Sequence, residues 1–439
     1  MANLVKNEQI AKIESTPRIP AIDFVRGLAI ILMALDHAST YWNVGRTGRT
    51  GAGLTSWSEE AGAFTNFFRP EYGGDLLNFL VRFVTHWCAP TFVFLAGTSI
   101  VLFEARRLER GVPQSEITKH LVIRGLILLL IEWTIIAWAF HAAPFYFGVL
   151  ALIGVGFLIF AFLRHISWKI ILGFSLFLFL EPLIDGFIIG LPGRNMSIFY
   201  YGFIFNQLPA DIEHFLLTVS FWPNWPKGLY PLDPWLGVMG LGFAFGHWLL
   251  KQKIPEDNHI IAKRLALVGS VTIVVFFILR LLQGWPVNYL GIWESNGVLR
   301  PDAFTIETFF LLAKYPPSIG FLLWTLGGMC LALSLAFYFQ DQEWFQKWTL
   351  PVVLFGSTPL FFYSIHLLLY GAVPFLMSVV LYGEPTHYAF IGTVFADALF
   401  LSLLVTIAVW LIGLLILYPA CVTFQQMKRQ YPNSLLQFI

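Results

Sequence analysis

Residues 21–42 read AIDFVRGLAIILMALDHASTYW, an apolar run that also holds two aspartates, an arginine and a histidine. The run is long enough to cross the ~30 Å hydrocarbon core of a bilayer, which takes about 20 helical residues. Ionisable side chains within such a helix cost roughly 2.5–3.5 kcal/mol each on insertion scales, so they usually face a protein interior and serve a function. We therefore predict a transmembrane helix here, with Asp23, Arg26, Asp36 and His37 in a functional site.

The composition predicts that most of the chain lies in lipid. Of its 439 residues, 57% are hydrophobic and 12% are charged, whereas soluble domains carry about 25% charged residues. The net charge of +1 gives no reason to expect nucleic acid as a partner. Cys88, Cys330 and Cys421 lie far apart in apolar stretches. Because the sequence also lacks a zinc spacing and a phosphate-binding loop, we expect no metal.

Nine further apolar runs have the length of a membrane span, so the predicted fold class is all-α: a polytopic membrane helical bundle of about ten transmembrane helices. The ninth run contains Pro374 and is either one kinked helix or a helix followed by a re-entrant piece. The sixth run has the small-residue spacing that lets membrane helices approach closely, at Gly237, Gly240, Gly242 and Gly246. The predicted ranges are 21–42, 77–103, 121–140, 143–163, 169–189, 234–250, 261–282, 318–339, 351–381 and 394–418.

Basic residues gather before the first helix and after the even-numbered helices, as they do in cytoplasmic loops. Both termini are therefore predicted to be cytoplasmic, with residues 1–20 as an N-terminal segment, 21–420 as one membrane domain and 421–439 as a tail. The long connections then face the outside, where they suit the binding of a polar substrate. These connections are 43–76, 190–233 and 283–317.

Arg26 and His37 lie eleven positions apart, an interval that returns a helix to within about 20° of the same face and spans about 16 Å. One face of this helix, which would form a wall of a binding groove, would thus carry a cation near the cytoplasm and an imidazole deeper in the membrane. Acyl-CoA suits this wall, because guanidinium groups pair with phosphates and an imidazole can act as base or nucleophile in acyl transfer. We assign Arg26 and Arg124 to the donor. Asp36 or Asp23 could orient the imidazole, and Asp23 could equally form a structural ion pair with Arg26.

Further polar residues fall at a comparable depth in other predicted helices. His86 and His366 lie in the second and ninth helices, in the outer half of the membrane, and Glu132 lies in the third. A lone histidine in an apolar helix is usually a packing residue, but three at similar depth favour a site. We predict catalytic roles for His37, Asp36 and His86, and substrate-binding roles for Glu132, His366 and Tyr363. Tyr363 and Trp235 either line a cavity or anchor the membrane interface.

Several motifs resemble those of a known family. The run IDFVRGLAIILMALDH at 22–37 and HWCAPTFVFLAGTS at 86–99 are the more specific; PWLGVMGLGFAFG at 234–246, KYPPS at 314–318 and TPLFFYSIH at 358–366 add to them. The chain resembles bacterial membrane proteins related to heparan-alpha-glucosaminide N-acetyltransferase, within the membrane acyltransferase superfamily. This resemblance implies that Arg26 and His37 serve the acyl donor and the transfer, and that the protein lies in a bacterial inner membrane. The Asp–His pair at 36–37 and the lack of histidine in 43–76 depart from the eukaryotic members, which leaves the amino-sugar acceptor open.

The resulting hypothesis is a multi-pass membrane acyltransferase. It would move an acyl group, expected to be acetyl, from cytoplasmic acyl-CoA to an envelope glycan or amino-sugar acceptor at the outer face. The expected partners are the lipid bilayer, acyl-CoA and a sugar or glycan, with a homodimer left open. The alternative is a proton-coupled transporter or flippase, in which buried carboxylates and histidines form a relay. A membrane scaffold with tolerated polar residues is the third interpretation, which the clustered charges of the first helix disfavour.

Overall fold

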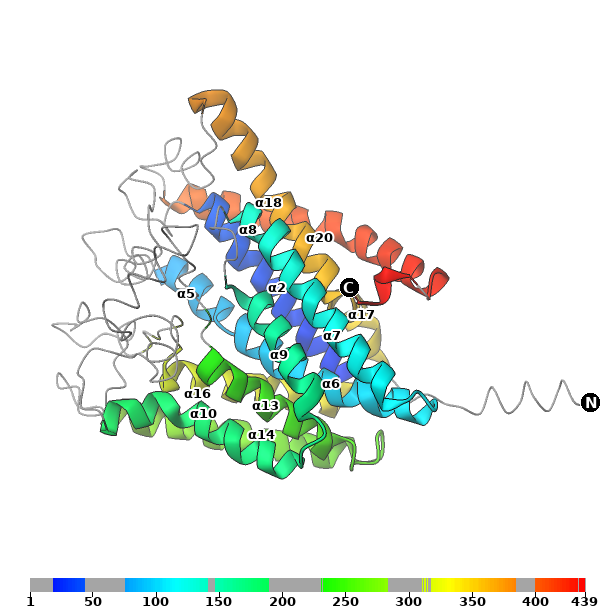
Figure 1. Cartoon of the computed structure of the whole chain (residues 1–439). Coiled ribbons are helices and arrows are strands. Elements are labelled where there is room, and N and C mark those ends of the chain that lie inside the picture. The colour runs from blue at the N-terminus through cyan, green and yellow to red at the C-terminus, as the bar shows by residue number, and fades with distance from the viewer. Residues whose placement is uncertain are drawn as a thin grey trace, which may run out of the picture.

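A computed structural model describes residues 19–43, 76–140, 147–188, 230, 232–282, 310, 312, 314, 317–383, 399–432 and 434–438. Within these ranges the chain is helical, with no strand beyond one isolated bridge between Lys314 and Pro317 (Figure 1). The elements are α2 (Pro20–Trp42), α5 (Leu76–Thr85), α6 (Cys88–Glu109), α7 (Gln114–Ile131), the π-helix η2 (Glu132–Ile136), α8 (Ala137–Ala139), α9 (Val149–Leu163), α10 (Trp168–Ile188), α13 (Leu232–Leu249), α14 (Asn258–Leu282), α16 (Ile319–Phe339), α17 (Glu343–Ser357), α18 (Pro359–Tyr382), α20 (Leu399–Gln430) and the 3-10 helix η4 (Leu435–Phe438).

Six helical segments in the described ranges are long and apolar enough to cross a membrane. Two shorter apolar helices, Val149–Leu163 and Trp168–Leu180, accompany them. The all-helical class is therefore confirmed for the described residues, while ten crossings and cytoplasmic termini stay predictions. The six segments are Phe83–Glu109, Gln114–Ala139, Asn258–Leu281, Ile319–Phe339, Pro359–Met377 and Leu403–Gln430.

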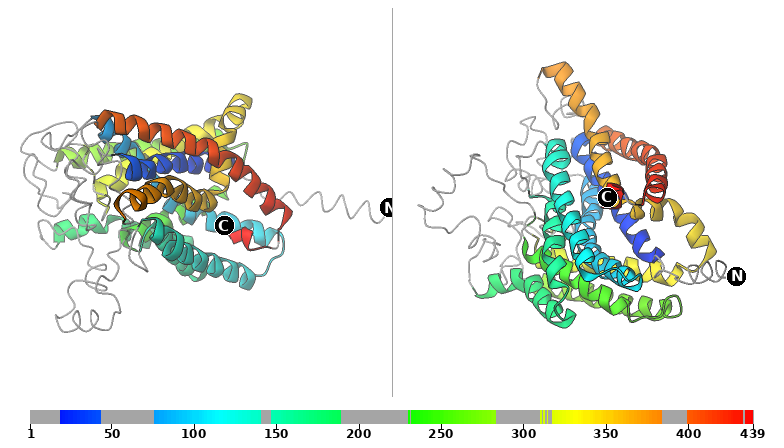
Figure 2. Two further views of the ribbon diagram at one scale, coloured as in Figure 1. Left: turned by 90° about the horizontal axis from the view of Figure 1, so that it is seen from above. Right: turned by 45° about the vertical axis from the view of Figure 1, so that its right-hand side comes forward.

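Helix α2 lies in the middle of the bundle (Figures 1 and 2). It packs against α5, α6, α16, α17, α18 and α20, and both of its aspartates are buried. Helices α14 and α20, in contrast, expose large apolar side chains such as Leu267, Leu281 and Leu415. Exposed leucines suit lipid and buried carboxylates require protein partners, so the ionisable helix occupies the protein interior, as predicted.

Close helix crossings depend on glycines. A Cβ atom added at Gly242 of α13 would lie 1.8 Å from the carbonyl oxygen of Phe94 on α6, so these helices touch backbone to backbone. Gly237 faces Ser175 of α10 in the same way, which confirms the close approach predicted from the glycine spacing. A third crossing, between Gly27 of α2 and Gly356 of α17, is as tight as that at Gly242 and was not part of the prediction.

Two prolines explain where helices break. Pro90 lacks an N–H and its ring crowds the carbonyl four residues earlier, that of His86, where α5 gives way to α6. Pro359 opens α18, and Thr358 before it leaves the helical region with φ −127° and ψ 46°. Pro374, by contrast, lies inside α18. The interruption expected in the ninth helix therefore lies at Thr358, and the helix before it begins at Glu343.

Candidate active site

A cavity of about 600 Å³ opens at the end of the bundle where α2 begins and where α6 and α20 end. Its described walls come from α2, α6, α7, α9, α17, α18, α20 and η4. Six basic residues line it against a single carboxylate, Asp23, among the lining residues that the structure describes. Such an excess of cations in one hollow attracts an anionic ligand. The six are Arg26, Arg106, Arg107, Arg110, Arg124 and Lys428.

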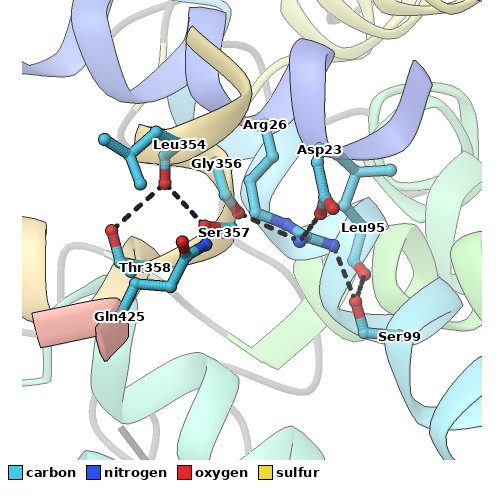
Figure 3. Close-up of polar contacts among 9 residues, drawn as sticks. All are labelled: Asp23, Arg26, Leu95, Ser99, Leu354, Gly356, Ser357, Thr358 and Gln425. Atoms are coloured by element: carbon cyan, nitrogen blue, oxygen red, sulfur yellow. Dashed lines mark hydrogen bonds and ion pairs between the residues drawn. The ribbon is translucent and has the colours of Figure 1, made fainter. Parts of the chain in front are cut away.

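Arg26 is held by a residue of its own helix and by two neighbouring helices (Figure 3). Its Nη1 donates to Asp23 Oδ1 at 2.9 Å and to the carbonyl oxygen of Gly356 at 3.2 Å, and its Nη2 donates to Ser99 Oγ at 2.9 Å. Ser99 Oγ in turn donates to the carbonyl oxygen of Leu95 at 2.6 Å. The ion pair with Asp23, left open by the sequence, is therefore present, and it orients a guanidinium that still lines the cavity.

Arg124 lines the same cavity from α7. Its guanidinium lies over the ring of Phe157, with Cζ 5.3 Å from the ring centroid. Its Nε is buried and has no hydrogen-bond partner among the described residues. A guanidinium with a buried donor that the described protein groups leave unsatisfied is suited to an anion. The two arginines assigned to the donor thus line one hollow from two different helices.

Tyr363 connects this cavity to a pair of histidines. The Tyr363 side chain lines the cavity, and its ring lies 5.9 Å from that of His37 and 5.5 Å from that of His366, measured between centroids. The two imidazoles are nearly parallel, with centroids 4.9 Å apart and an interplanar angle of 15°. The structure therefore brings together His37, His366 and Tyr363, with Tyr363 between the histidines and the basic hollow.

Hydrogen bonds assign the tautomers of the histidine pair. His366 Nδ1 lies 2.9 Å from the carbonyl oxygen of Phe362, and because a carbonyl only accepts, Nδ1 must carry the proton. In the neutral ring, Nε2 of His366 is then an acceptor, and it lies 2.7 Å from His37 Nδ1. His37 consequently donates through Nδ1, and its neutral ring carries the lone pair at Nε2. That arrangement gives His37 the form of a general base.

The contacts that the structure shows for Asp36 and His86 are with other residues than the histidine pair. Asp36 is buried and accepts a hydrogen bond from Thr85 Oγ1 at 3.0 Å, which links α2 to α5. His86, at the break after Thr85, is buried with its ring 5.4 Å from that of Phe321. The structure shows a hydrogen bond between His37 and His366. Sequence reasoning did not predict this pairing, although it placed His37 and His366 at a similar depth in the membrane.

Residues 64–281, about half of the chain, match the family model described as the catalytic region of heparan-alpha-glucosaminide N-acetyltransferase. The chain belongs to this family. No curated protein matches the chain. Together with the six apolar helices, the family match indicates an integral membrane protein.

The region shared with the N-acetyltransferase family contains α6, α7 and α9, which form much of the cavity wall. Of the predicted site residues it includes His86, Arg124 and Glu132. The histidine pair lies outside it, on α2 and α18. In the described ranges, no group of three or more His, Cys, Asp or Glu is placed to hold a metal ion.

Two other predicted positions have clear surroundings. Trp235 is fully buried, with its ring 5.2 Å from Tyr230 and 6.3 Å from Phe321, so it does not anchor the membrane interface.

Glu132 begins the π-helix η2, an element often found at functional sites. Its Oε2 accepts a hydrogen bond from the backbone N–H of Leu150 at 2.9 Å. The carboxylate thereby caps the first turn of α9, whose amides lack partners within the helix.

Glu132 should therefore stabilise the fold through this cap. We expect Glu132→Ala to lower the free energy of unfolding by about 1–2 kcal/mol, the usual cost of losing an N-terminal cap. Glu132→Gln should cost much less, since its amide oxygen still accepts from Leu150. Thermal unfolding of both variants in detergent tests the difference. Equal destabilisation of the two would contradict a capping role.

Proposed function

We propose that the protein is a membrane acyltransferase that takes an acyl group, with acetyl expected, from cytoplasmic acyl-CoA. The acceptor would be an amino sugar or hydroxyl of an envelope glycan at the outer face of a bacterial inner membrane. One observation carries the proposal: Tyr363 lines a hollow that six basic residues also line, and its ring contacts both members of a hydrogen-bonded histidine pair.

The lining of the cavity supports CoA as the ligand. Arginines bind phosphate oxygens through two parallel hydrogen bonds, and Arg106, Arg107 and Arg110 stand together at the end of α6. Deeper in, the walls become apolar at Leu128 and Ile153. A molecule with phosphates at one end and an uncharged arm at the other fits this gradient, with the thioester directed to Tyr363.

His37 would act as the general base. In this step the acceptor nitrogen or oxygen attacks the thioester carbonyl while its proton passes to His37 Nε2. Collapse of the tetrahedral intermediate breaks the carbon–sulfur bond, and the CoA thiolate leaves and takes up the proton. His366 would be a positioning residue, because its Nε2 accepts from His37 Nδ1 and so favours the imidazolium that forms during transfer.

The family match supports the same chemistry. The name of the matched family describes transfer of an acetyl group to the nitrogen of a glucosaminide, which makes an amino sugar the first acceptor to test. Buried polar groups also suit the transporter alternative. A transporter or flippase of another substrate gives no reason for CoA to bind, whereas the proposed enzyme requires it.

Binding of labelled acetyl-CoA to the purified protein therefore tests the proposal. Arg124→Gln should raise the dissociation constant roughly 10- to 100-fold, as expected when a hydrogen bond to a charged group is lost. Arg264→Gln is the matched control, because Arg264 is exposed and lies over Trp248 of α13. An unchanged dissociation constant of acetyl-CoA in Arg124→Gln would contradict a role for Arg124 in binding the donor. Absence of binding to the wild type would favour the transporter.

A further inference from the structure

The chain turns back on itself after α20 and returns to the cavity. α20 ends with the N–H of Tyr431 donating to the carbonyl oxygen of Met427 at 2.9 Å, and Pro432 follows, which cannot continue the helix. Ser434 Oγ then donates to the carbonyl oxygen of Tyr431 at 2.7 Å. The last described residues form η4 (Leu435–Phe438) and lie back against the bundle (Figure 2).

Three aromatic rings from three elements stack at this place. The ring of Phe438 in η4 lies 4.5 Å from that of His120 in α7, at an interplanar angle of 29°. The other face of His120 carries Phe103 of α6, also at 4.5 Å and at 23°. Arg107 lies over Phe103, with Cζ 5.2 Å from the ring centroid. η4 has no buried residue, so the stack on His120 is a main anchor of the end of the chain.

The same segment forms part of the cavity wall. Pro432 and Gln437 line the cavity together with Lys428. Gln437 precedes Phe438, which stacks through His120 on Phe103, the ring that Arg107 covers, so this part of the wall lies near the arginines of α6. An anionic ligand held by these cations must therefore lie next to the end of the chain.

We propose that the C-terminal segment, in its described residues 428–432 and 434–438, is the wall of the donor site that holds the nucleotide end of CoA. This inference rests on the proposed function, since it takes the ligand to be CoA. The phosphates would lie among Arg106, Arg107 and Lys428, and the adenine would lie under the segment that Phe438 clamps to His120. The pantetheine arm extends away from this wall toward Tyr363, so loss of the clamp weakens recognition of the nucleotide and spares recognition of the arm.

Ligands that carry either part of CoA test the inference in the full-length protein. Phe438→Ala should raise the dissociation constants of CoA and of adenosine 3′,5′-bisphosphate roughly five- to tenfold, the factor for loss of one aromatic contact. Binding of S-acetylpantetheine, which has no nucleotide, should not change. Phe438→Trp keeps a ring on His120 and should retain wild-type affinity. Leu435→Ala is the matched control, because Leu435 lies in the same helix and is 72% exposed.

The outcomes separate the two proposals. Wild-type affinity of Phe438→Ala for CoA would overturn the clamp and leave the proposed function intact. An equal loss for S-acetylpantetheine would also overturn it, because the segment would then support the whole cavity rather than the nucleotide. If the wild type bound neither CoA nor the bisphosphate, this result would contradict the proposed function and therefore also the clamp.

Discussion

His37→Ala should lower the rate of acyl transfer roughly 10²- to 10⁴-fold, the range that a positioned general base contributes. The reason is that His37 carries the lone pair at Nε2 while its Nδ1 is held by His366, and alanine offers neither. Affinity for acetyl-CoA should stay near the wild-type value, because the basic residues of the cavity are untouched. Proteoliposomes loaded with acetyl-CoA and supplied with an external amino sugar measure the rate.

His259→Ala is the control for this experiment. His259 is an exposed histidine at the start of α14, in ring contact with Tyr338, and its loss should leave the rate unchanged. His366→Asn should give an intermediate rate and retain donor affinity, since it disturbs the orientation of His37 without removing the base. Full activity of His37→Ala, with normal expression, would contradict the role of His37 as general base.

Gly356→Ala should destabilise the protein severely although it adds one methyl group. The new Cβ would lie 1.8 Å from the carbonyl oxygen of Asp23 and 2.7 Å from the backbone nitrogen of Gly27, so α2 and α17 must move apart. Overpacking of this kind costs about 1–3 kcal/mol or more. The shift also moves the Gly356 carbonyl that accepts from Arg26, so CoA binding should weaken. Thermal unfolding in detergent and acetyl-CoA binding measure the two effects.

Gly173→Ala provides the matched substitution. Nothing lies within 4 Å of a Cβ added at Gly173 of α10, and the same methyl group should be neutral there. If Gly356→Ala unfolded at the same temperature as Gly173→Ala, the tight crossing of α2 and α17 would be refuted.

Helix positions could be predicted because a membrane span needs about 20 consecutive apolar residues, a strong one-dimensional signal. The predicted range 318–339 agrees with α16, for example, and the ionisable residues of 21–42 do face protein. The ion pair of Asp23 with Arg26 also follows from positions three apart on one helix. Each of these features depends on residues close in sequence.

The unpredicted features depend on how one helix is rotated against another. The hydrogen bond between His37 and His366 joins residues 329 positions apart, and hydropathy does not fix the angle at which α18 faces α2. The cap that Glu132 provides to α9 is likewise a contact between two helices. The arginines at the end of α6 entered the prediction as part of the cytoplasmic basic loops, which mark orientation and could contact the phosphates of CoA, but not as named site residues. Three basic residues within five positions, Arg106 to Arg110, were the signal that could have identified the mouth of the cavity.

The position of Tyr363 has a consequence for the permeability of the membrane. Its ring stands between the basic hollow and the histidine pair, and moving phosphates past an aromatic side chain into a low-dielectric interior is very unfavourable. In the proposed reaction the nucleotide would stay on the side from which it entered, and only the small acyl fragment would pass the phenol ring. Turnover would then open no continuous aqueous path, so an acyl group could be exported without a leak of ions or metabolites.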